Sequence, residues 1–348
     1  MGKYKIAILS RWNATCGVSM HAELIGREFV KLGNEIVVFA PTLESANKWW
    51  HHLPIKDDED FVVRCYEEIS PEGKGGKIHA EKILDNYDIF IIESYSSIPH
   101  SEIERILPKI KKSAKTVLVV HEGSRKQLKY SNLDMFDAIV VFDERYKREI
   151  LYDHENVHII PYPCHPIRRR NETKVSDELV FFSFGRQPIR EYSDYIAVLK
   201  DLRNKYDLIY RIVRSDNKSL GISESWIDHR FERVSLEKLY DYLYSSNVHL
   251  LPKGETSYVV VSSTLCQCLG SLCPVVAPAT RHFEALPEKD GIKPAVLYND
   301  RSDLKAKIER LIEDDDYRTS VIKMAEEYVN ENSSEIVAKK FMKLFNEL

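Results

Sequence analysis

Two stretches in the second half of the chain contain residue types that suit a phosphate group. In the first, an apolar run ends at Gly185 and is followed by Arg186 and, four residues later, Arg190. Arginine side chains bind phosphate oxygens through two parallel hydrogen bonds and stay charged at any working pH. In the second, Gly254–Thr264, the carboxylate of Glu255 precedes a hydroxyl cluster. Cations for a diphosphate and a carboxylate for sugar hydroxyls together predict a nucleotide-sugar site.

The hydroxyl cluster consists of Ser262, Ser263 and Thr264, at the expected start of an apolar helix. Free backbone amides at a helix start bind anions, so this segment is a second candidate for the phosphate contact. Ordinary helix capping explains one of the three hydroxyls but does not need all of them. For the arginines, the alternative to phosphate binding is surface pairing with Glu191 or Asp194.

In the first half, Gly17 and Val18 lie in the loop between the first expected strand and a helix whose N-cap we expect at Ser19. This loop lacks the GxGxxG spacing, which disfavours a dehydrogenase with a bound dinucleotide. A single glycine at such a turn is explained equally well by backbone geometry. The other interpretation is that Gly17 and Val18 let backbone amides approach the donor phosphate or the reacting sugar.

A histidine, His121, ends another apolar strand and is followed by Glu122. It is either a structural cap on the sheet or a substrate contact at a strand end. In the second case we expect Glu122 to orient the imidazole.

Strands and helices alternate along the whole chain, which predicts two parallel sheets, each covered by helices on both faces. The fold class is therefore α/β, with two doubly wound, Rossmann-like domains facing a cleft. Ligands of such sheets lie beyond the carboxyl ends of the strands, where Gly17, His121, Gly185 and Glu255 all fall. The strands are expected at Lys5–Leu9, Glu35–Ala40, Phe61–Tyr66, Ile89–Glu93, Thr116–His121, Ala138–Asp143, Val157–Pro161, Val180–Phe184, Ile209–Val213, His229–Val234, Val248–Leu251, Val275–Ala277 and Ala295–Tyr298, and first-half helices at Met20–Leu32, Lys77–Asn86, Ser101–Lys112 and Glu144–Tyr152.

Composition narrows the classes of function. The 348 residues are 43% hydrophobic and carry a net charge of −4, without the basic excess of a nucleic-acid binder. No apolar run could span a bilayer and no signal peptide is readable, so we expect a cytoplasmic protein. The six cysteines lack paired CxxC spacing, and we expect no metal site.

The order of these motifs resembles the family 4 glycosyltransferases, retaining enzymes with the two-domain GT-B fold. The family shows a glycine turn after strand one, a histidine at a strand end of the first domain, and Gly-Arg followed by a basic residue. It also has two glutamates eight residues apart before a Gly-x-Pro-Val-Val run. Gly17, His121, Gly185–Arg186 with Arg190, Glu255 and Gly270–Val276 occupy the matching places over nearly the whole chain.

The sequence departs from the family pattern at three places. Arg190 stands where a lysine is usual, Ser263 occupies the place of the second glutamate, and Gly270 lies four residues before Pro274 rather than two. Some branches carry a serine-rich version of this loop. The change at Ser263 puts in doubt which residue contacts the ribose.

The resemblance implies a hexosyltransferase that uses a UDP- or GDP-sugar as donor and has no cofactor or metal. Arg186, Arg190 and the amides of Ser262–Thr264 would meet the departing diphosphate, and His121 would touch the donor sugar. The implied domains are 1–165 for the acceptor, 166–177 as linker and 178–330 for the donor, with a helix at 331–348 packing back on the first domain. The implied acceptor is a glycan, a lipid-linked group or a small molecule, and not a nucleic acid.

Two segments leave open a peripheral contact with the inner face of a membrane. Asn47–Leu53 is an aromatic patch, and Ile103–Lys112 is basic and amphipathic, although a solvated helix over the sheet is favoured for the second. Two other functions remain alternatives: a sugar-nucleotide epimerase of the same fold and a non-catalytic nucleotide-sugar-binding subunit. The oligomeric state is not readable from the sequence.

Overall fold

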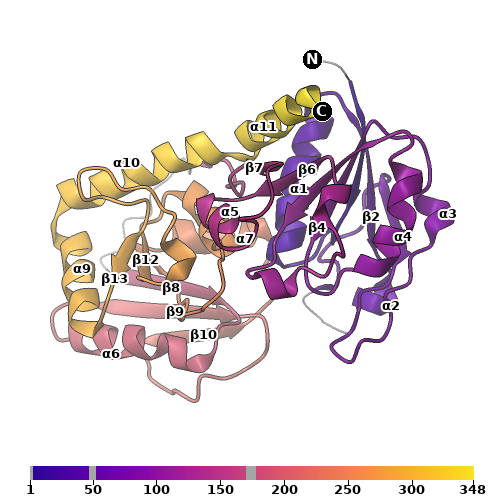
Figure 1. The fold of residues 1–348 in the computed structure, drawn as a ribbon. Helices are drawn as coiled ribbons and strands as arrows, with labels where there is room; N and C mark the ends of the chain where they lie inside the picture. Colours follow the sequence, from indigo (N-terminus) through magenta and orange to yellow (C-terminus); the bar gives the residue numbers. More distant parts are fainter. Residues whose placement is uncertain (1–2, 47–51, 170–177) are drawn as a thin grey trace. The chain divides into compact units, whose positions relative to one another are not determined.

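The computed structural model describes residues 3–46, 52–169 and 178–348. Most of the expected aromatic patch, residues 47–51, and the linker residues 170–177 lie outside the described residues. The chain divides into two compact units (Figure 1). Unit 1 comprises residues 1–163, 258–263 and 332–348, and unit 2 comprises residues 164–257 and 264–331.

Unit 1 is built on a seven-stranded parallel sheet in the order β3-β2-β1-β4-β5-β6-β7. The central strands are almost wholly buried and apolar, as parallel strands covered on both faces must be. The order reverses between β1 and β4, which makes the carboxyl ends of these two strands the switch point where doubly wound sheets bind ligands. The strands are β1 Lys5–Leu9, β2 Glu35–Pro41, β3 Val62–Tyr66, β4 Ile89–Ser94, β5 Lys115–Val120, β6 Ala138–Val141 and β7 Val157–Ile159.

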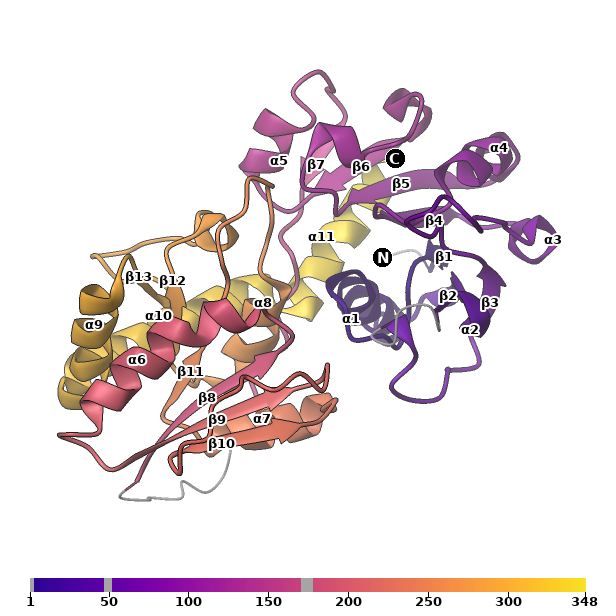
Figure 2. The same ribbon diagram turned by 90° about the horizontal axis from the view of Figure 1, so that it is seen from below.

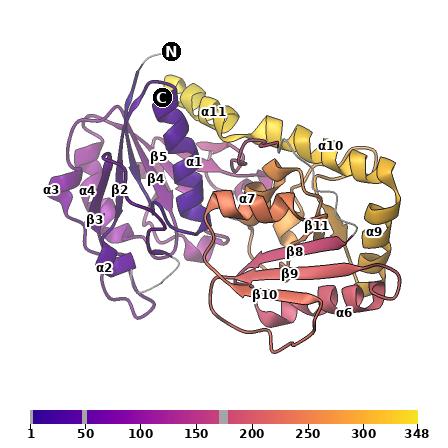
Figure 3. The same cartoon turned by 180° about the vertical axis from the view of Figure 1, so that it is seen from behind.

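Helices cover both faces of this sheet. α1 (Gly17–Lys31) and α4 (His100–Ile110) lie on opposite sides of the strands (Figures 1 and 3). The C-terminal helix α11 (Ser334–Glu347) packs on α1, where Phe341 and Phe345 contact Phe29. The shorter helices are α2 Leu43–Ala46, α3 Ala80–Ile83 and α5 Glu144–Glu149.

Unit 2 is built on a six-stranded parallel sheet in the order β10-β9-β8-β11-β12-β13 (Figure 2). Numbered within the unit, this is the 3-2-1-4-5-6 order of a doubly wound nucleotide-binding sheet. Its switch point lies between β8 and β11. The strands are β8 Leu179–Gly185, β9 Leu208–Arg214, β10 Ile227–Phe231, β11 Val248–Leu250, β12 Val275–Pro278 and β13 Val296–Tyr298.

Alternate side chains of these strands build two cores. Phe181 and Tyr210 face a core shared with α6 (Ser193–Leu202) and α9 (Arg301–Glu313), whereas Phe182 faces α7 (Leu236–Tyr244). This alternation follows from the period of two in a strand. α6 and α7 accordingly lie on opposite sides of the sheet (Figures 1 and 3). The remaining helices are α8 Ser263–Cys268 and α10 Asp315–Asn332.

The structure confirms the predicted α/β class, and each predicted strand overlaps an observed one. The predicted N-cap at Ser19 is wrong, because α1 already begins at Gly17 after Cys16. The Ser19 hydroxyl instead accepts from the backbone N–H of Ala14 at 2.9 Å and donates to Glu23 at 2.7 Å. A serine near a helix start can bond inside the first turn as well as cap it, and the sequence does not distinguish the two.

Two predicted helices are shorter in the structure. The segment expected to be helical over 77–86 forms only α3, and the one expected over 144–152 ends at Glu149. The helix expected over 101–112 is α4, which continues through Pro108 to Ile110. The apolar residues of α4, including Ile103, Ile106 and Ile110, are buried, as in a helix that covers the sheet. No helix among the described residues has the length and apolar character needed to cross a bilayer.

Candidate active site

The first cluster of candidate residues lies at the end of β8 in unit 2. Gly185 has a φ of 126°, a conformation that residues with a Cβ rarely adopt. A Cβ at this position would lie 2.5 Å from Oε1 of Gln187. The strand can therefore turn sharply here only with glycine, and Arg186 follows directly after the turn.

A buried arginine on the neighbouring strand fixes this turn. Arg214 pairs with Gly185 in the β8–β9 register and is 1% exposed. Its guanidinium donates to the backbone oxygen of Gln187 at 2.9 Å and to both carboxylate oxygens of Asp216 at 3.0 and 2.7 Å. A paired, hydrogen-bonded charge of this kind is costly to break, so Arg214 holds the backbone on either side of Arg186 in place.

The second predicted arginine is in a different setting. Arg190 is exposed on a 3-10 turn at Ile189–Tyr192. Asp194, which we considered as a surface partner for the two arginines, instead pairs with Arg301 at 2.6 Å. The structure thus places Arg186 beside the switch point and Arg190 on the surface four residues further on.

The loop after β11, the other strand of this switch point, adds a cation that the sequence analysis did not single out. Lys253 is half-buried and lies near both Glu191 and Arg186. Burial and, more weakly, the positive charge of Arg186 lower its pKa, while Glu191 opposes the shift. The next residue, Gly254, allows close approach, because a Cβ there would lie 2.7 Å from Oε1 of Glu191. Glu255 is exposed in the same loop.

The predicted hydroxyl cluster is divided between the two units. Ser262 and Ser263 belong to unit 1, whereas Thr264 begins the second part of unit 2. The expected long helix is a six-residue α8 followed by a 3-10 turn, and Leu272 then has a φ of 61°. The amides at the start of such a short helix are a weaker anion site than the expected helix would provide.

Residues 258–263 are held against loops of unit 1. The backbone N–H of Val259 donates to the oxygen of Gly123 at 2.9 Å, and Arg145 donates to the oxygen of Val260 at 3.0 Å. A Cβ at Gly17 would lie 3.1 Å from Oγ of Ser263. The structure therefore brings together two of the predicted site residues that are about 250 positions apart.

Gly17 and Val18 form the start of α1. The oxygen of Gly17 accepts a hydrogen bond from the Tyr162 hydroxyl at 2.6 Å, and Val18 is buried. Since this hydroxyl occupies the oxygen and Ser263 stands beside the Cα, glycine at position 17 is explained by close packing.

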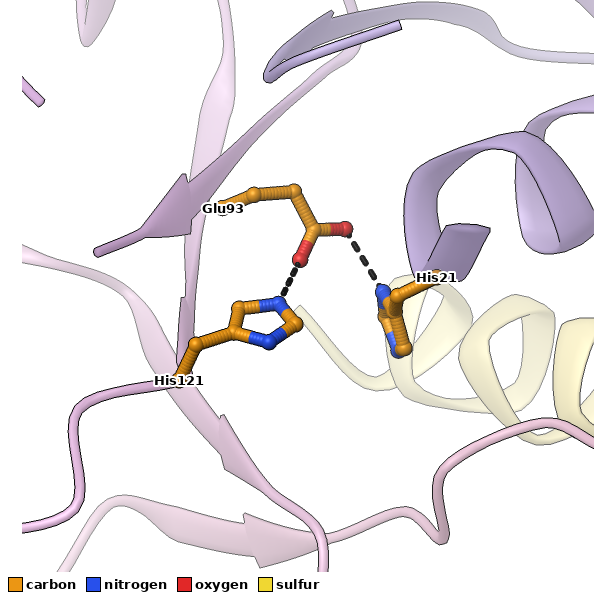
Figure 4. A group of neighbouring side chains, drawn as sticks. All are labelled: His21, Glu93 and His121. Atoms are coloured by element: carbon orange, nitrogen blue, oxygen red, sulfur yellow. Dashed lines mark hydrogen bonds and ion pairs between the residues drawn. The ribbon is translucent and has the colours of Figure 1, made fainter. Parts of the chain in front are cut away.

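His121 takes part in a buried hydrogen-bonded group with Glu93 and His21 (Figure 4). One carboxylate oxygen of Glu93 lies 2.6 Å from Nε2 of His121, and the other lies 2.8 Å from Nδ1 of His21. Glu93 and His21 are fully buried and the His121 side chain is 10% exposed. The prediction that Glu122 orients His121 is wrong: Glu122 accepts from the Ser94 hydroxyl at 2.6 Å, and Glu93 takes the predicted role.

The burial of this group sets its protonation. Burial alone would raise the pKa of Glu93, but the interactions of its carboxylate with His21 and His121 lower it to about 2. Burial lowers the pKa of His21, only partly opposed by Glu93. At neutral pH, Glu93 is thus ionised and His21 is neutral, donating from Nδ1.

Within the described residues, His21, Glu93 and His121 are also the one group of ligand-type side chains close enough to hold a metal ion. Tetrahedral zinc, with bonds of about 2.0 to 2.2 Å, separates its ligand atoms by roughly 3.3 Å. The observed 2.6 and 2.8 Å separations instead match N–H···O hydrogen bonds to a carboxylate.

Lys253, Glu93 and His21 are among the residues of these clusters that were not singled out from the sequence. A signal existed for Glu93, which is a carboxylate at the end of the apolar run Ile89–Ile92. A buried acid in such a strand needs a partner. His21 has the weaker signal of an imidazole on the buried face of an amphipathic helix, and Lys253 has none, since most loop lysines are solvated.

No protein-family model matches the chain. Solved structures do match it over its whole length. Three of them are the pneumococcal O-GlcNAc transferase GtfA with UDP and GlcNAc (12% identity, 100% of this chain and 99% of that one, TM-score 0.69), HepE of Anabaena with UDP-glucose (14%, 99% and 100%, 0.64), and an α-glucosyltransferase with UDP and a 13-mer DNA (15%, 99% and 100%, 0.69). At these identities the likeness concerns the fold. The chain thus has the α/β two-domain GT-B fold that its sequence predicted.

Proposed function

We propose that this protein is a retaining glycosyltransferase that moves a hexose from a nucleoside-diphosphate sugar to an acceptor hydroxyl without a metal ion. The observation that carries the proposal is the glycine-dependent turn that presents Arg186 at the switch point of unit 2, with Lys253 beside it. Two neighbouring cations on a nucleotide-binding sheet repel each other, and an anionic diphosphate would relieve that repulsion. The UDP carried by the similar structures supports the same ligand class.

In the proposed reaction, the bond between the anomeric carbon and the diphosphate breaks while the acceptor oxygen bonds to that carbon from the same face. The acceptor hydroxyl passes its proton to the departing diphosphate oxygen. Negative charge then grows on the departing diphosphate. Arg186 and Lys253 stabilise this charge, and the Arg214–Asp216 pair keeps the Arg186 turn in place. Arg190 and Glu255 are the flanking charged groups, and we assign Glu255 to the hydroxyls of the ribose or sugar. His121 in unit 1 is assigned to the transferred sugar.

The acceptor belongs to the proposal only as a class. We propose a glycan, a lipid-linked sugar or a small molecule that offers a hydroxyl group. The net charge of −4 gives the chain no general affinity for nucleic acid.

The proposal is tested by incubating the protein with UDP- and GDP-hexoses in EDTA and following release of the nucleoside diphosphate. We expect slow release by hydrolysis with one nucleotide series and faster release when an acceptor is added. NMR of the released sugar at early times should show that the anomeric configuration is retained. Conversion of the donor into an epimer identifies the epimerase alternative. Tight binding of a sugar nucleotide without turnover, whichever acceptor is added, identifies the binding-subunit alternative. Either of these two results contradicts the proposal.

A further inference from the structure

The group formed by His21, Glu93 and His121 has only one way to share its hydrogen bonds. The ionised carboxylate of Glu93 accepts at both oxygens, so both nitrogens that face it carry a proton. These are Nδ1 of His21 and Nε2 of His121. In a neutral imidazole the opposite nitrogen is then an acceptor, which is Nδ1 for His121. Figure 4 shows that this nitrogen points away from Glu93.

His21 cannot change its tautomer cheaply. Its Nε2 is buried and has no hydrogen-bond partner among the described residues. The His21 ring is surrounded by aromatic rings. Its centroid lies 5.3, 5.3, 5.4 and 6.1 Å from the ring centroids of His121, Phe142, Tyr162 and Phe341. Within the described part of the chain, Nε2 is unpaired in either tautomer, but orphaned buried N–H donors are rarer in proteins than under-satisfied acceptors, which favours the lone pair on this nitrogen. His21 therefore favours the tautomer that offers its Nδ1–H to residue 93.

We propose that Glu93 and His21 are positioning residues that hold His121 in the Nε2–H tautomer, so that its Nδ1 accepts a hydrogen bond from a hydroxyl group of the transferred sugar. This inference rests on the proposed function for the identity of the substrate. The orientation of the ring and its tautomer follow from the geometry of the group. His121 is then a specificity-determining contact, because a sugar without a hydroxyl at that place leaves this acceptor unpaired.

The variant Glu93→Gln separates this role from a general loss of packing. An amide offers one acceptor and one donor, whereas both histidines present donors to residue 93. His21 cannot flip at low cost, so the amide oxygen faces His21 and the amide N–H₂ faces His121. His121 must then accept at Nε2 and carry its proton on Nδ1. The atom presented to the sugar changes from an acceptor to a donor.

The experiment uses ¹⁵N-histidine-labelled full-length protein without substrate, at a pH at which His121 is neutral, with His121→Gln to assign its signals. We expect the Nε2–H tautomer in the wild type and the Nδ1–H tautomer in Glu93→Gln, together with at least about a tenfold fall in kcat for donor turnover. In the double variant Glu93→Gln with His21→Phe, the amide oxygen is free to turn to His121. The Nε2–H tautomer and part of the turnover should then return.

Glu122→Gln is the matched control, because Glu122 is a buried glutamate next to His121 in sequence that bonds Ser94 instead. It should leave the His121 tautomer unchanged and turnover within about threefold of the wild type. The inference is overturned if Glu93→Gln leaves the His121 tautomer unchanged. It is also overturned if the double variant restores neither the Nε2–H tautomer nor any of the turnover lost in Glu93→Gln. A stoichiometric metal ion in the purified wild type that is lost in Glu93→Gln overturns it as well. A wild type with the expected tautomers but no nucleotide-sugar turnover contradicts the proposed function and not the positioning by Glu93.

Discussion

Lys253 and Arg186 are two cations that lie near each other in unit 2, and the charge of Arg186 contributes to the lowered pKa of Lys253. A site that concentrates positive charge in a half-buried loop is poised for an anion. Glu191 offsets part of this charge in the absence of ligand. At the scale of single residues, the diphosphate assignment therefore depends on Lys253 as much as on the two arginines predicted from the sequence.

The variant Lys253→Met should weaken binding of the donor nucleotide. Hydrogen bonds to charged groups contribute about 1.5 to 3 kcal/mol, so we expect a Kd for the nucleoside diphosphate that is roughly 10- to 100-fold higher. Isothermal titration calorimetry measures this change. Lys200→Met is the control. It removes an exposed lysine of α6 that pairs with Glu224, and it should leave the Kd unchanged. Equal Kd values for the two variants would remove Lys253 from the site.

A site residue was predictable from the sequence where the residues next to it in the chain indicate its role. Gly185–Arg186 was recognised because a glycine and an arginine directly follow an apolar run, and the structure places both at a switch point. The choice between Glu93 and Glu122 as the partner of His121 was not predictable. It depends on which strand end lies beside His121 in space, and only the pairing of β4 with β5 supplies that information.

At the scale of secondary structure, the end of β8 determines where Arg186 points. Gly185→Ala places a side chain in a left-handed conformation and against Gln187. Such strain costs about 1 to 3 kcal/mol, and we expect both lower stability in urea unfolding and weaker nucleotide binding. Gly221→Ala is the control, since Gly221 also has a positive φ, of 69°, but a Cβ there meets nothing within 4 Å. It should lower stability without changing the Kd; a normal Kd in Gly185→Ala would show that the turn does not shape the site.

Strand β11 contains a buried histidine that makes unit 2 sensitive to acid. His249 is fully buried against Phe182 and Phe184, and burial lowers its pKa to about 3. Between pH 6.5 and 3 the unfolded chain binds a proton at this residue that the folded protein does not. Stability therefore falls as the pH falls through this window.

The variant His249→Phe should remove this contribution. The difference in free energy of unfolding, variant minus wild type, should be roughly 2 kcal/mol larger at pH 5 than at pH 7. Urea unfolding at the two pH values measures it. Other buried histidines, such as His21, contribute equally to both proteins and cancel in the comparison. A difference that is the same at both pH values would show that His249 is not held neutral.

The strands were predictable because buried parallel strands are continuous apolar runs, and each strand within residues 3–46, 52–169 and 178–348 was located. Helix ends were less predictable. The chain forms α8 as only six residues and ends the following turn with Leu272 at a positive φ, although leucine gives no signal for such a turn. Tertiary packing, rather than local preference, decides such ends.

At the scale of the whole molecule, the alternation of strands and helices predicted two doubly wound parallel sheets, and both observed sheets are parallel. The sequence did not reveal that residues 258–263 belong to unit 1 while their flanks belong to unit 2. That assignment depends on contacts with Gly123 and Arg145, which are more than a hundred positions away.

The proposed chemistry places the charge stabilisation on protein cations, so chelation should leave turnover intact. We expect the rate of nucleoside diphosphate release in EDTA to stay within about twofold of the rate in buffer with Mg²⁺ or Mn²⁺, since Arg186 and Lys253 supply the positive charge. Steady-state assays with and without chelator measure this. Restoration of a lost activity by Mn²⁺ alone would contradict the metal-independent mechanism.

The most direct test of the central claim is the rate of nucleoside diphosphate release from the preferred sugar nucleotide by the wild type, by Arg186→Ala and by Arg301→Ala. Arg301 pairs with Asp194 on the surface of unit 2 and serves as the control. The account predicts turnover by the wild type and the control, and a loss of about 2.7 to 4 kcal/mol of transition-state stabilisation, or roughly 100- to 1000-fold in rate, in Arg186→Ala. Turnover in Arg186→Ala within threefold of the wild type, or no turnover of any sugar nucleotide by the wild type, would contradict it.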